Sequence, residues 1–175
     1  EKNYAADAGR LAVAEHLKRR GIAANVTAAP EAQALNRVRF TLPNPLPLVS
    51  VIIPTRDHVD LLSTCVHSIL KLTTYPVFEI IIIDNGSVET ATADFFASLP
   101  ADRVKVIRDD SPFNFSALNN HGAQTAHGEL LCLMNNDIEI LTPDWLDEMV
   151  SFAMQPEVGC VGARLWYPDG RLQHG

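Results

Sequence analysis

Polar side chains follow three short apolar runs of this sequence, at the points where each run ends. Residues 54–57, Pro-Thr-Arg-Asp, follow the first run; Asp84 follows the second; Asp137, preceded by two asparagines, follows the third. An unpaired carboxylate beside a buried segment is costly to desolvate unless it binds something. Carboxylate and amide oxygens suit Mg²⁺ or Mn²⁺, which take oxygen ligands and accept phosphates and water in the same shell. These segments therefore indicate a metal or phosphate site, although a polar turn explains each one taken alone.

Alternating strand and helix patterns must position these residues. Strand patterns lie at 48–53, 78–83, 103–108, 129–134 and 158–163, and helical patterns at 57–72, 87–98, 116–126 and 142–153. Runs that are apolar throughout are typical of strands covered on both faces. The alternation predicts an α/β fold whose sheet is largely parallel and flanked by helices. Ligands of such sheets bind at the carboxyl ends of the strands, where the polar residues fall.

Helix boundaries are predicted from residues that commonly occupy helix ends. Asp57, Ser87 and Thr142 each stand at the start of a helical pattern and are expected to be N-caps. Gly128 follows the pattern at 116–126 and is expected to end that helix.

The first 47 residues differ in character from the rest. An Ala-rich helical pattern at 4–20 ends at Gly21, a weaker strand pattern follows at 37–41, and prolines at 43, 45 and 47 mark a linker. We expect residues 1–47 to be a helical extension with a Pro-rich linker, the tail of a preceding module. Residues 48–175 are expected to form one domain.

Composition excludes several classes of protein. The 175 residues are 47% apolar and 20% charged, with a net charge of −7, so global disorder and a broad nucleic-acid-binding surface are not expected. No apolar run approaches the ~20 residues of a membrane span, so we expect no transmembrane segment. The three cysteines are far apart, which favours buried free thiols in a reducing compartment over zinc or disulfides.

Glycine-rich and nucleophile motifs are absent. The sequence contains neither G-x-G-x-x-G nor G-x-x-x-x-G-K-[ST], and it contains no G-x-S-x-G. Their absence weighs against a dinucleotide dehydrogenase, a P-loop NTPase and a serine hydrolase.

Four segments, in this order, resemble the successive motifs of family-two glycosyltransferases with the GT-A fold: VIIPTR (51–56), IIDNGS (82–87), PFNFSALNN (112–120) and LMNNDIE (133–139). The segments PEVGCVGA (156–163) and YPDGRLQHG (167–175) are also similar to this family. The resemblance covers residues 48–175. It looks most like the branch found in bacterial surface-polysaccharide and rhamnosyl-type transferases.

The resemblance implies a nucleoside-diphosphate sugar donor and a divalent metal, Mn²⁺ or Mg²⁺. Asp137 is the metal-binding residue that it implies, whereas Asn135 departs from the commoner Asp at the first position of the D-x-D motif. The donor-binding residues that it implies are Pro54, Thr55, Arg56, Asp84, Asn85, Asn119, Asn136 and Asp137.

The resemblance also implies inverting glycosyl transfer in cell-surface polysaccharide synthesis, with a glycan or lipid-linked glycan as acceptor. The family's catalytic base is a carboxylate further along the chain, so we expect a C-terminally truncated fragment without that base. Asp169 lies in Pro-Asp-Gly, which is typical of a hairpin turn. The expected location is the cytoplasm, including the inner face of the membrane. Self-association through apolar surface exposed by truncation is a further expectation.

Three other classes of protein are alternatives to a glycosyltransferase. A transferase-like binding or interaction module without turnover would show no metal-dependent affinity for nucleotides. A sugar nucleotidyltransferase would need a Gly-rich segment after the first strand, which is missing. A receiver-type regulatory domain would need a lysine after a late strand, and residues 158–175 contain none.

Overall fold

The computed structural model describes residues 4–30 and 32–174. The chain divides into two compact units, one formed by residues 45–146 and the other by residues 1–44 together with 147–175. The expected division into 1–47 and 48–175 stays a prediction. Within the described residues, no helix has the length and apolar character that crossing a membrane requires.

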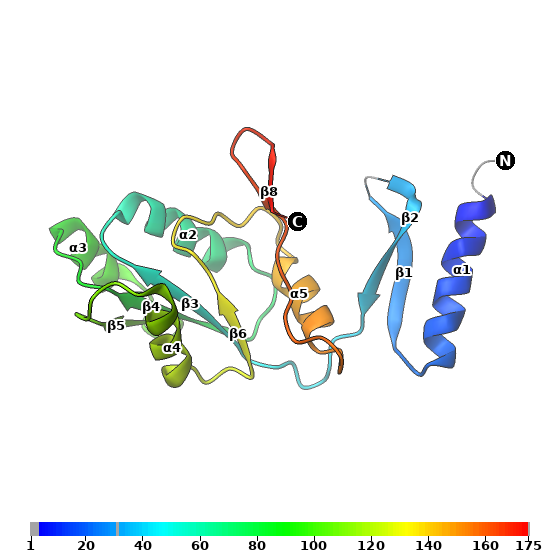
Figure 1. The fold of residues 1–175 in the computed structure, drawn as a ribbon, viewed down its shortest axis with the longest axis horizontal. Helices are drawn as coiled ribbons and strands as arrows, with labels where there is room; N and C mark the ends of the chain where they lie inside the picture. The colour runs from blue at the N-terminus through cyan, green and yellow to red at the C-terminus, as the bar shows by residue number, and fades with distance from the viewer. Residues whose placement is uncertain (1–3, 31, 175) are drawn as a thin grey trace. The chain divides into compact units, whose positions relative to one another are not determined.

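A four-stranded parallel sheet forms the centre of the unit 45–146 (Figure 1). Its spatial order is β5-β4-β3-β6. The strands are β3 (Val49–Thr55), β4 (Phe78–Asp84), β5 (Val104–Arg108) and β6 (Leu130–Leu133). Four of the five strands predicted after residue 47 are confirmed, with boundaries shifted by one or two residues.

Burial explains why these segments are strands. Every residue of β3 is buried, and in β4 only Glu79 is partly exposed, because helices cover both faces of the sheet. The helices of this unit are α2 (Val59–Leu72), α3 (Thr90–Ser98) and α4 (Phe115–Thr125). Figure 1 shows α2 and α4 on opposite sides of the sheet. On the α4 side, Leu118 packs against Ile52, Ile81 and Ile83.

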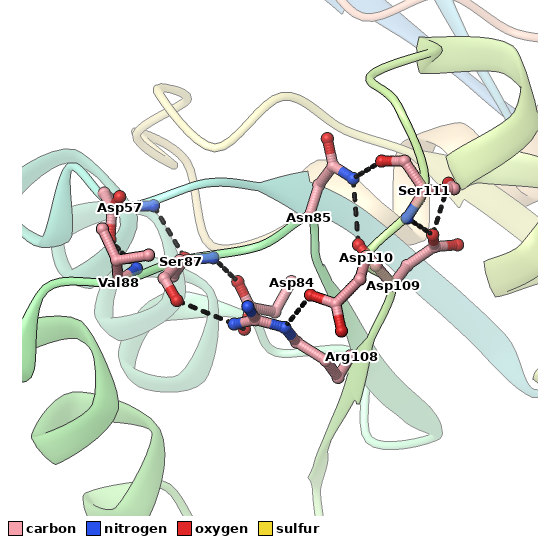
Figure 2. A network of polar contacts seen from close by, with 9 residues as sticks. All are labelled: Asp57, Asp84, Asn85, Ser87, Val88, Arg108, Asp109, Asp110 and Ser111. Carbon is pink, nitrogen blue, oxygen red and sulfur yellow. Dashed lines mark hydrogen bonds and ion pairs between the residues drawn. The ribbon is translucent and has the colours of Figure 1, made fainter.

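Two predicted helix caps are wrong. The backbone of Asp57 is left-handed (φ 51°), and α2 begins beyond His58. The Asp57 carboxylate instead accepts a hydrogen bond from the Val88 N–H, 2.9 Å away (Figure 2). It also accepts one from the Glu89 N–H at 2.9 Å. The Ser87 hydroxyl accepts the Asp57 N–H at 2.8 Å, and Glu89 occupies the N-cap of α3. Both side chains therefore tie the β3 and β4 ends together rather than begin their own helices.

The predictions for Gly128 and Thr142 are also wrong. The residue after α4, Ala126, is extended, so no left-handed glycine ends that helix. A Cβ on Gly128 would lie 2.7 Å from the carbonyl oxygen of Leu48 and the nitrogen of Ser50, so Gly128 lets two backbone segments approach closely. Helix α5 (Trp145–Ala153) begins three residues after Thr142.

The described part of the other unit contains α1 (Tyr4–Arg19) and an antiparallel hairpin, β1 (Ala24–Ala29) with β2 (Ala32–Phe40). The helix is confirmed, and Gly21 ends it with a positive φ of 69°. The predicted strand at 37–41 is the end of β2, whereas the sequence analysis did not predict β1.

Charged and aromatic contacts link the C-terminal segment of this unit to β2. The Glu148 carboxylate pairs with Arg37, at 2.7 Å, and with Arg39. The rings of Phe40 and Phe152 meet edge to face, 5.2 Å between centroids.

The predicted strand at 158–163 is wrong, because this segment forms no strand. Gly159 and Gly162 offer no side chain to pack, which disfavours a strand. A short hairpin follows instead, β7 (Leu165–Trp166) with β8 (Leu172–His174). The turn predicted at Pro-Asp-Gly is confirmed: the Gly170 N–H donates to the Tyr167 carbonyl at 2.9 Å, and Gly170 has a φ of 82°.

A cross-strand ion pair joins the carboxyl ends of β4 and β5. Asp84 and Arg108 are register partners, and Arg108 Nη1 lies 2.8 Å from Asp84 Oδ2. The Asp84 side chain is 7% exposed and that of Arg108 is 47% exposed. A buried carboxylate at this position therefore depends on a cation that reaches it from the surface.

We predict that Gly128→Ala destabilises the chain by about 1–3 kcal/mol, because the added methyl group meets backbone atoms that cannot rotate away. Urea unfolding followed by circular dichroism measures the change. Gly159→Ala is the control, since a Cβ there meets nothing within 4 Å. Equal stability of Gly128→Ala and the parent protein would contradict the close approach.

We predict that Arg108→Met lowers the free energy of unfolding, because it leaves the buried Asp84 carboxylate without its cation. The double variant Asp84→Asn/Arg108→Met should lose less than the sum of the single variants. Lys105→Met, on an exposed position of the same strand, is the control. Additive losses in the double-mutant cycle would show that the two side chains are not coupled.

Candidate functional site

A cavity of about 240 Å³ opens at the carboxyl ends of the parallel strands, as the sheet topology predicts. Its wall comes from the ends of β3 and β4, the segment that leads into α4 together with the first turn of that helix, and the segment after β6. The lining residues are Pro54, Thr55, Arg56, Asn85, Phe113, Phe115, Leu118, Asn135, Asn136 and Asp137.

The cavity gathers most of the residues that the sequence analysis singled out. Those that line it are Pro54, Thr55, Arg56, Asn85, Asn136 and Asp137. Asp84 and Asn119 do not line it, although both are buried close to the same strand and helix ends. The binding role of each residue stays a prediction.

Asp84 is engaged by the protein itself. Besides the ion pair with Arg108, its Oδ1 atom accepts the Ser87 N–H at 2.9 Å. Arg108 also donates to the Ser87 carbonyl at 2.7 Å and to Asp110 at 2.6 Å (Figure 2). Asp84 therefore shapes the loop after β4.

Two buried amide oxygens have no partner in the structure. Asn85 is 4% exposed, and its Nδ2 donates to the carbonyls of Asp109 (3.0 Å) and Ser111 (2.8 Å). Those two acceptors fix the amide orientation, so its Oδ1 points away from them and stays unpaired (Figure 2). Asn119, also 4% exposed, donates to the Phe115 carbonyl and leaves its Oδ1 unpaired. An unpaired buried acceptor is costly, and the one on Asn85 belongs to a residue that lines the cavity.

The loop from Asp109 to Ser111 is held by charge-assisted hydrogen bonds. Asp109 accepts from the Ser111 hydroxyl at 2.5 Å and lies 2.7 Å from His121 Nδ1. These hydrogen bonds, from Ser111 first and then His121, lower the pKa of Asp109 to about 2. A hydrogen bond from the Glu89 N–H likewise lowers the pKa of Asp57. Both carboxylates are therefore ionised at neutral pH and keep their partners.

The segment after β6 is anchored on two sides. Asn136 Nδ2 donates to the Thr55 hydroxyl at 3.0 Å, and the Ser68 hydroxyl of α2 accepts the Ile140 N–H at 3.0 Å. The Cys65 thiol lies 3.7 Å from the Asn135 carbonyl, and burial raises the pKa of that thiol to about 12. These contacts hold Asp137, which is exposed, at the cavity wall.

The donor set at this wall fits a metal ion that is shared with a phosphate ligand. Asp137 supplies one carboxylate, and Asn135 and Asn136 carry amide oxygens, whereas Glu139 is exposed and does not line the cavity. Nowhere in the part of the chain that the structure describes do three or more His, Cys, Asp or Glu side chains gather as a metal cage. Mg²⁺ commonly needs only one or two carboxylates when substrate phosphates complete its shell.

Aromatic wall residues were missed from the sequence. Phe113 and Phe115 line the cavity with exposed fractions of 73% and 44%, and Leu118 lies beside them on the wall. The available signal was the pair of phenylalanines around Asn114, which caps α4 by accepting the Ala117 N–H at 3.0 Å. Asn135 was noted only as a departure from a motif.

Comparison with known sequences identifies relatives along the whole chain. It is 49% identical over 179 residues to the uncharacterized protein y4gI of Sinorhizobium fredii, covering 99% of this chain and 19% of that protein. It is 44% identical over 170 residues to the O-antigen biosynthesis protein RfbC of Myxococcus xanthus, covering 97% of this chain and 13% of that protein. The chain thus spans less than a fifth of the length of these two relatives.

Solved structures share the fold. The mannosyltransferase PcManGT from Pyrobaculum calidifontis, in complex with GDP-Man and Mn²⁺, superposes with a TM-score of 0.58 at 22% identity, covering 65% of this chain and 34% of that one. GalNAc-T7 with UDP, GalNAc and Mn²⁺ gives a TM-score of 0.56 at 26% identity, covering 63% and 22%. The predicted α/β GT-A fold is confirmed. The model of glycosyl transferase family 2 matches residues 50–174, and the chain therefore belongs to that family.

Proposed function

We propose that the unit 45–146 binds a nucleoside-diphosphate sugar together with Mn²⁺ or Mg²⁺, for inverting glycosyl transfer in cell-surface polysaccharide synthesis. The observation that carries this proposal is the cavity at the strand ends, which is lined by the exposed Asp137 and by Asn85, a buried residue whose Oδ1 has no partner. The names of RfbC and of the two structural neighbours, which hold Mn²⁺ and nucleotide ligands, support it.

Each group of cavity residues has a proposed role. Asp137, with the amide oxygens of Asn135 and Asn136, would hold the metal, which neutralises negative charge on the departing diphosphate. Pro54, Thr55, Arg56 and Asn85 would contact the base and ribose. Asp84 and Asn119 would act indirectly, since the first holds the loop after β4 and the second holds the Phe115 carbonyl.

The acceptor half of the reaction is assigned to no residue of this chain. Asp169 is not proposed as the catalytic base, because it accepts from the Arg171 N–H (3.0 Å) and guanidinium (2.7 Å) inside a hairpin turn. A glycan or lipid-linked glycan remains the predicted acceptor. The cytoplasm, including the inner face of the membrane, remains the predicted location, and self-association remains a prediction.

A second candidate function is a binding module without turnover. Asn135 favours it, because an amide at this position leaves Asp137 as the only carboxylate among the described residues that line the cavity. Metal-dependent nucleotide binding would favour the transferase, and the absence of any nucleotide affinity would favour the module.

We predict that a nucleoside diphosphate at ~100 times its dissociation constant, with Mn²⁺, stabilises the chain by about 2.7 kcal/mol, or roughly 5–10 °C in Tm. A thermal-shift panel of UDP, GDP, CDP and ADP measures this. Asp137→Ala should abolish the metal-dependent part of the shift, because it removes the carboxylate at the cavity wall. Glu139→Ala, an exposed acid two residues away and outside the cavity, should keep the shift.

No shift with any nucleotide, from a wild-type chain that unfolds cooperatively, would overturn donor binding by this unit. An equal shift in Asp137→Ala would leave nucleotide binding in place and remove the metal assignment.

We predict that Asn135→Asp tightens Mn²⁺ binding, because a second carboxylate replaces an amide beside Asp137. Electron paramagnetic resonance of free Mn²⁺ measures the affinity with and without UDP. Asn36→Asp, at an exposed position of β2 outside the cavity, adds the same charge as a control. Equal affinity in Asn135→Asp and wild type would show that residue 135 does not face the metal.

A further inference from the structure

Two exposed phenylalanines stand on the cavity wall without a packing partner that buries them. Phe113 is 73% exposed and Phe115 is 44% exposed. With Leu118 they are the apolar lining that the chain segment 113–118 contributes, whereas the segment after β6 contributes the polar Asn135, Asn136 and Asp137. Exposed apolar side chains that line a cavity mark a ligand-contact surface more often than a random surface position does.

The division of the wall matches the chemistry of a nucleoside diphosphate. The diphosphate and its metal are polar and belong beside Asp137. Ribose and the transferred sugar are covered with hydroxyl groups. The base is the one part of the ligand with a flat, weakly hydrated face, and such faces stack on aromatic rings whatever the identity of the base.

Hydrogen bonds hold the segment that carries Phe113. Asn85 binds the carbonyls of both Asp109 and Ser111, which lie just before Pro112 in the chain. His121, from α4, reaches back to Asp109 at 2.7 Å. The His121–Asp109 contact therefore joins the two ends of the segment 109–121, and the hydrogen bonds from Asn85 hold this segment at the end of β4.

We propose, on the basis of the function proposed above, that Phe113 and Phe115 form the stacking wall for the base of the donor nucleotide. Asn85 and His121 are positioning residues for this wall. Asn85 fixes the loop from the end of β4, and His121 fixes it from α4. Affinity for the base thus resides in the loop before α4 and the first residue of that helix, and affinity for the diphosphate resides in the segment after β6.

Isothermal titration with UDP, GDP and inorganic pyrophosphate, each with Mn²⁺, tests the proposal. Pyrophosphate carries the charge of the donor without a base. In Phe113→Ala the nucleotide that wild type binds best should bind about 5- to 100-fold more weakly, as loss of one stacked ring predicts. Its affinity for pyrophosphate should be unchanged. Phe113→Tyr, which keeps the ring, should keep nucleotide affinity.

Two further variants separate positioning from a general structural role. His121→Leu removes the bond to Asp109 and should weaken nucleotide binding but not pyrophosphate binding. His121→Asn keeps a donor for Asp109 and should restore part of the loss. Leu141→Ala, 68% exposed and outside the cavity, is the control and should change neither affinity. Circular dichroism melts establish that each variant is folded.

Unchanged nucleotide affinity in Phe113→Ala would overturn the stacking wall, as would an equal loss for nucleotide and pyrophosphate. Wild type that binds pyrophosphate as tightly as any nucleotide would overturn it too, while leaving the metal and diphosphate site intact. Wild type that binds no nucleotide and no pyrophosphate would overturn the proposed function itself.

Discussion

The parallel register of two buried strands is the constraint on which the rest of the site depends. β3 and β4 pair residue for residue, so Thr55 and Asp84 finish side by side, and Arg108 finishes beside Asp84 on the next strand. A carboxylate at a buried strand end is tolerable only with compensating partners. Arg108 and the Ser87 N–H supply them, and both contacts also fix the loop after β4. The cavity therefore lies beside loops whose conformations are set by burial in the sheet.

One consequence is that the neighbouring residues Asp84 and Asn85 have different roles. Asp84 and Asn85 are adjacent, yet the carboxylate is neutralised by the protein while the amide keeps an unpaired acceptor on a residue that lines the cavity. Asn85 can do this because two loop carbonyls occupy its nitrogen and leave its oxygen unused. The family resemblance implied the same donor-binding role for both residues. Their hydrogen bonds distinguish the two residues, because the Asp84 carboxylate is paired and the Asn85 Oδ1 atom is not.

Burial patterns made the central sheet predictable, because apolar runs such as 80–83 leave little alternative to a covered strand. The rule that ligands bind at strand ends then located most of the cavity. Capping rules failed at Asp57 and Ser87, because their partners lie about 30 residues away and outcompete the local helix. The strand predicted at 158–163 was wrong because an apolar composition does not by itself provide a neighbouring strand to pair with. Phe113 was missed because an exposed aromatic has no periodic pattern.

A single carboxylate on the cavity wall has a thermodynamic consequence for the order of binding. Asp137 with two neutral amides offers a divalent ion too few charges for tight binding alone. A diphosphate would supply the missing oxygens, so metal and nucleotide would each raise the affinity of the other, by the same factor. The proposed base stacking on Phe113 and Phe115 would add binding energy that does not depend on the metal. Such a site would bind a complete nucleotide–metal complex more tightly than it binds the metal alone, because only the complex fills both the metal site and the base site.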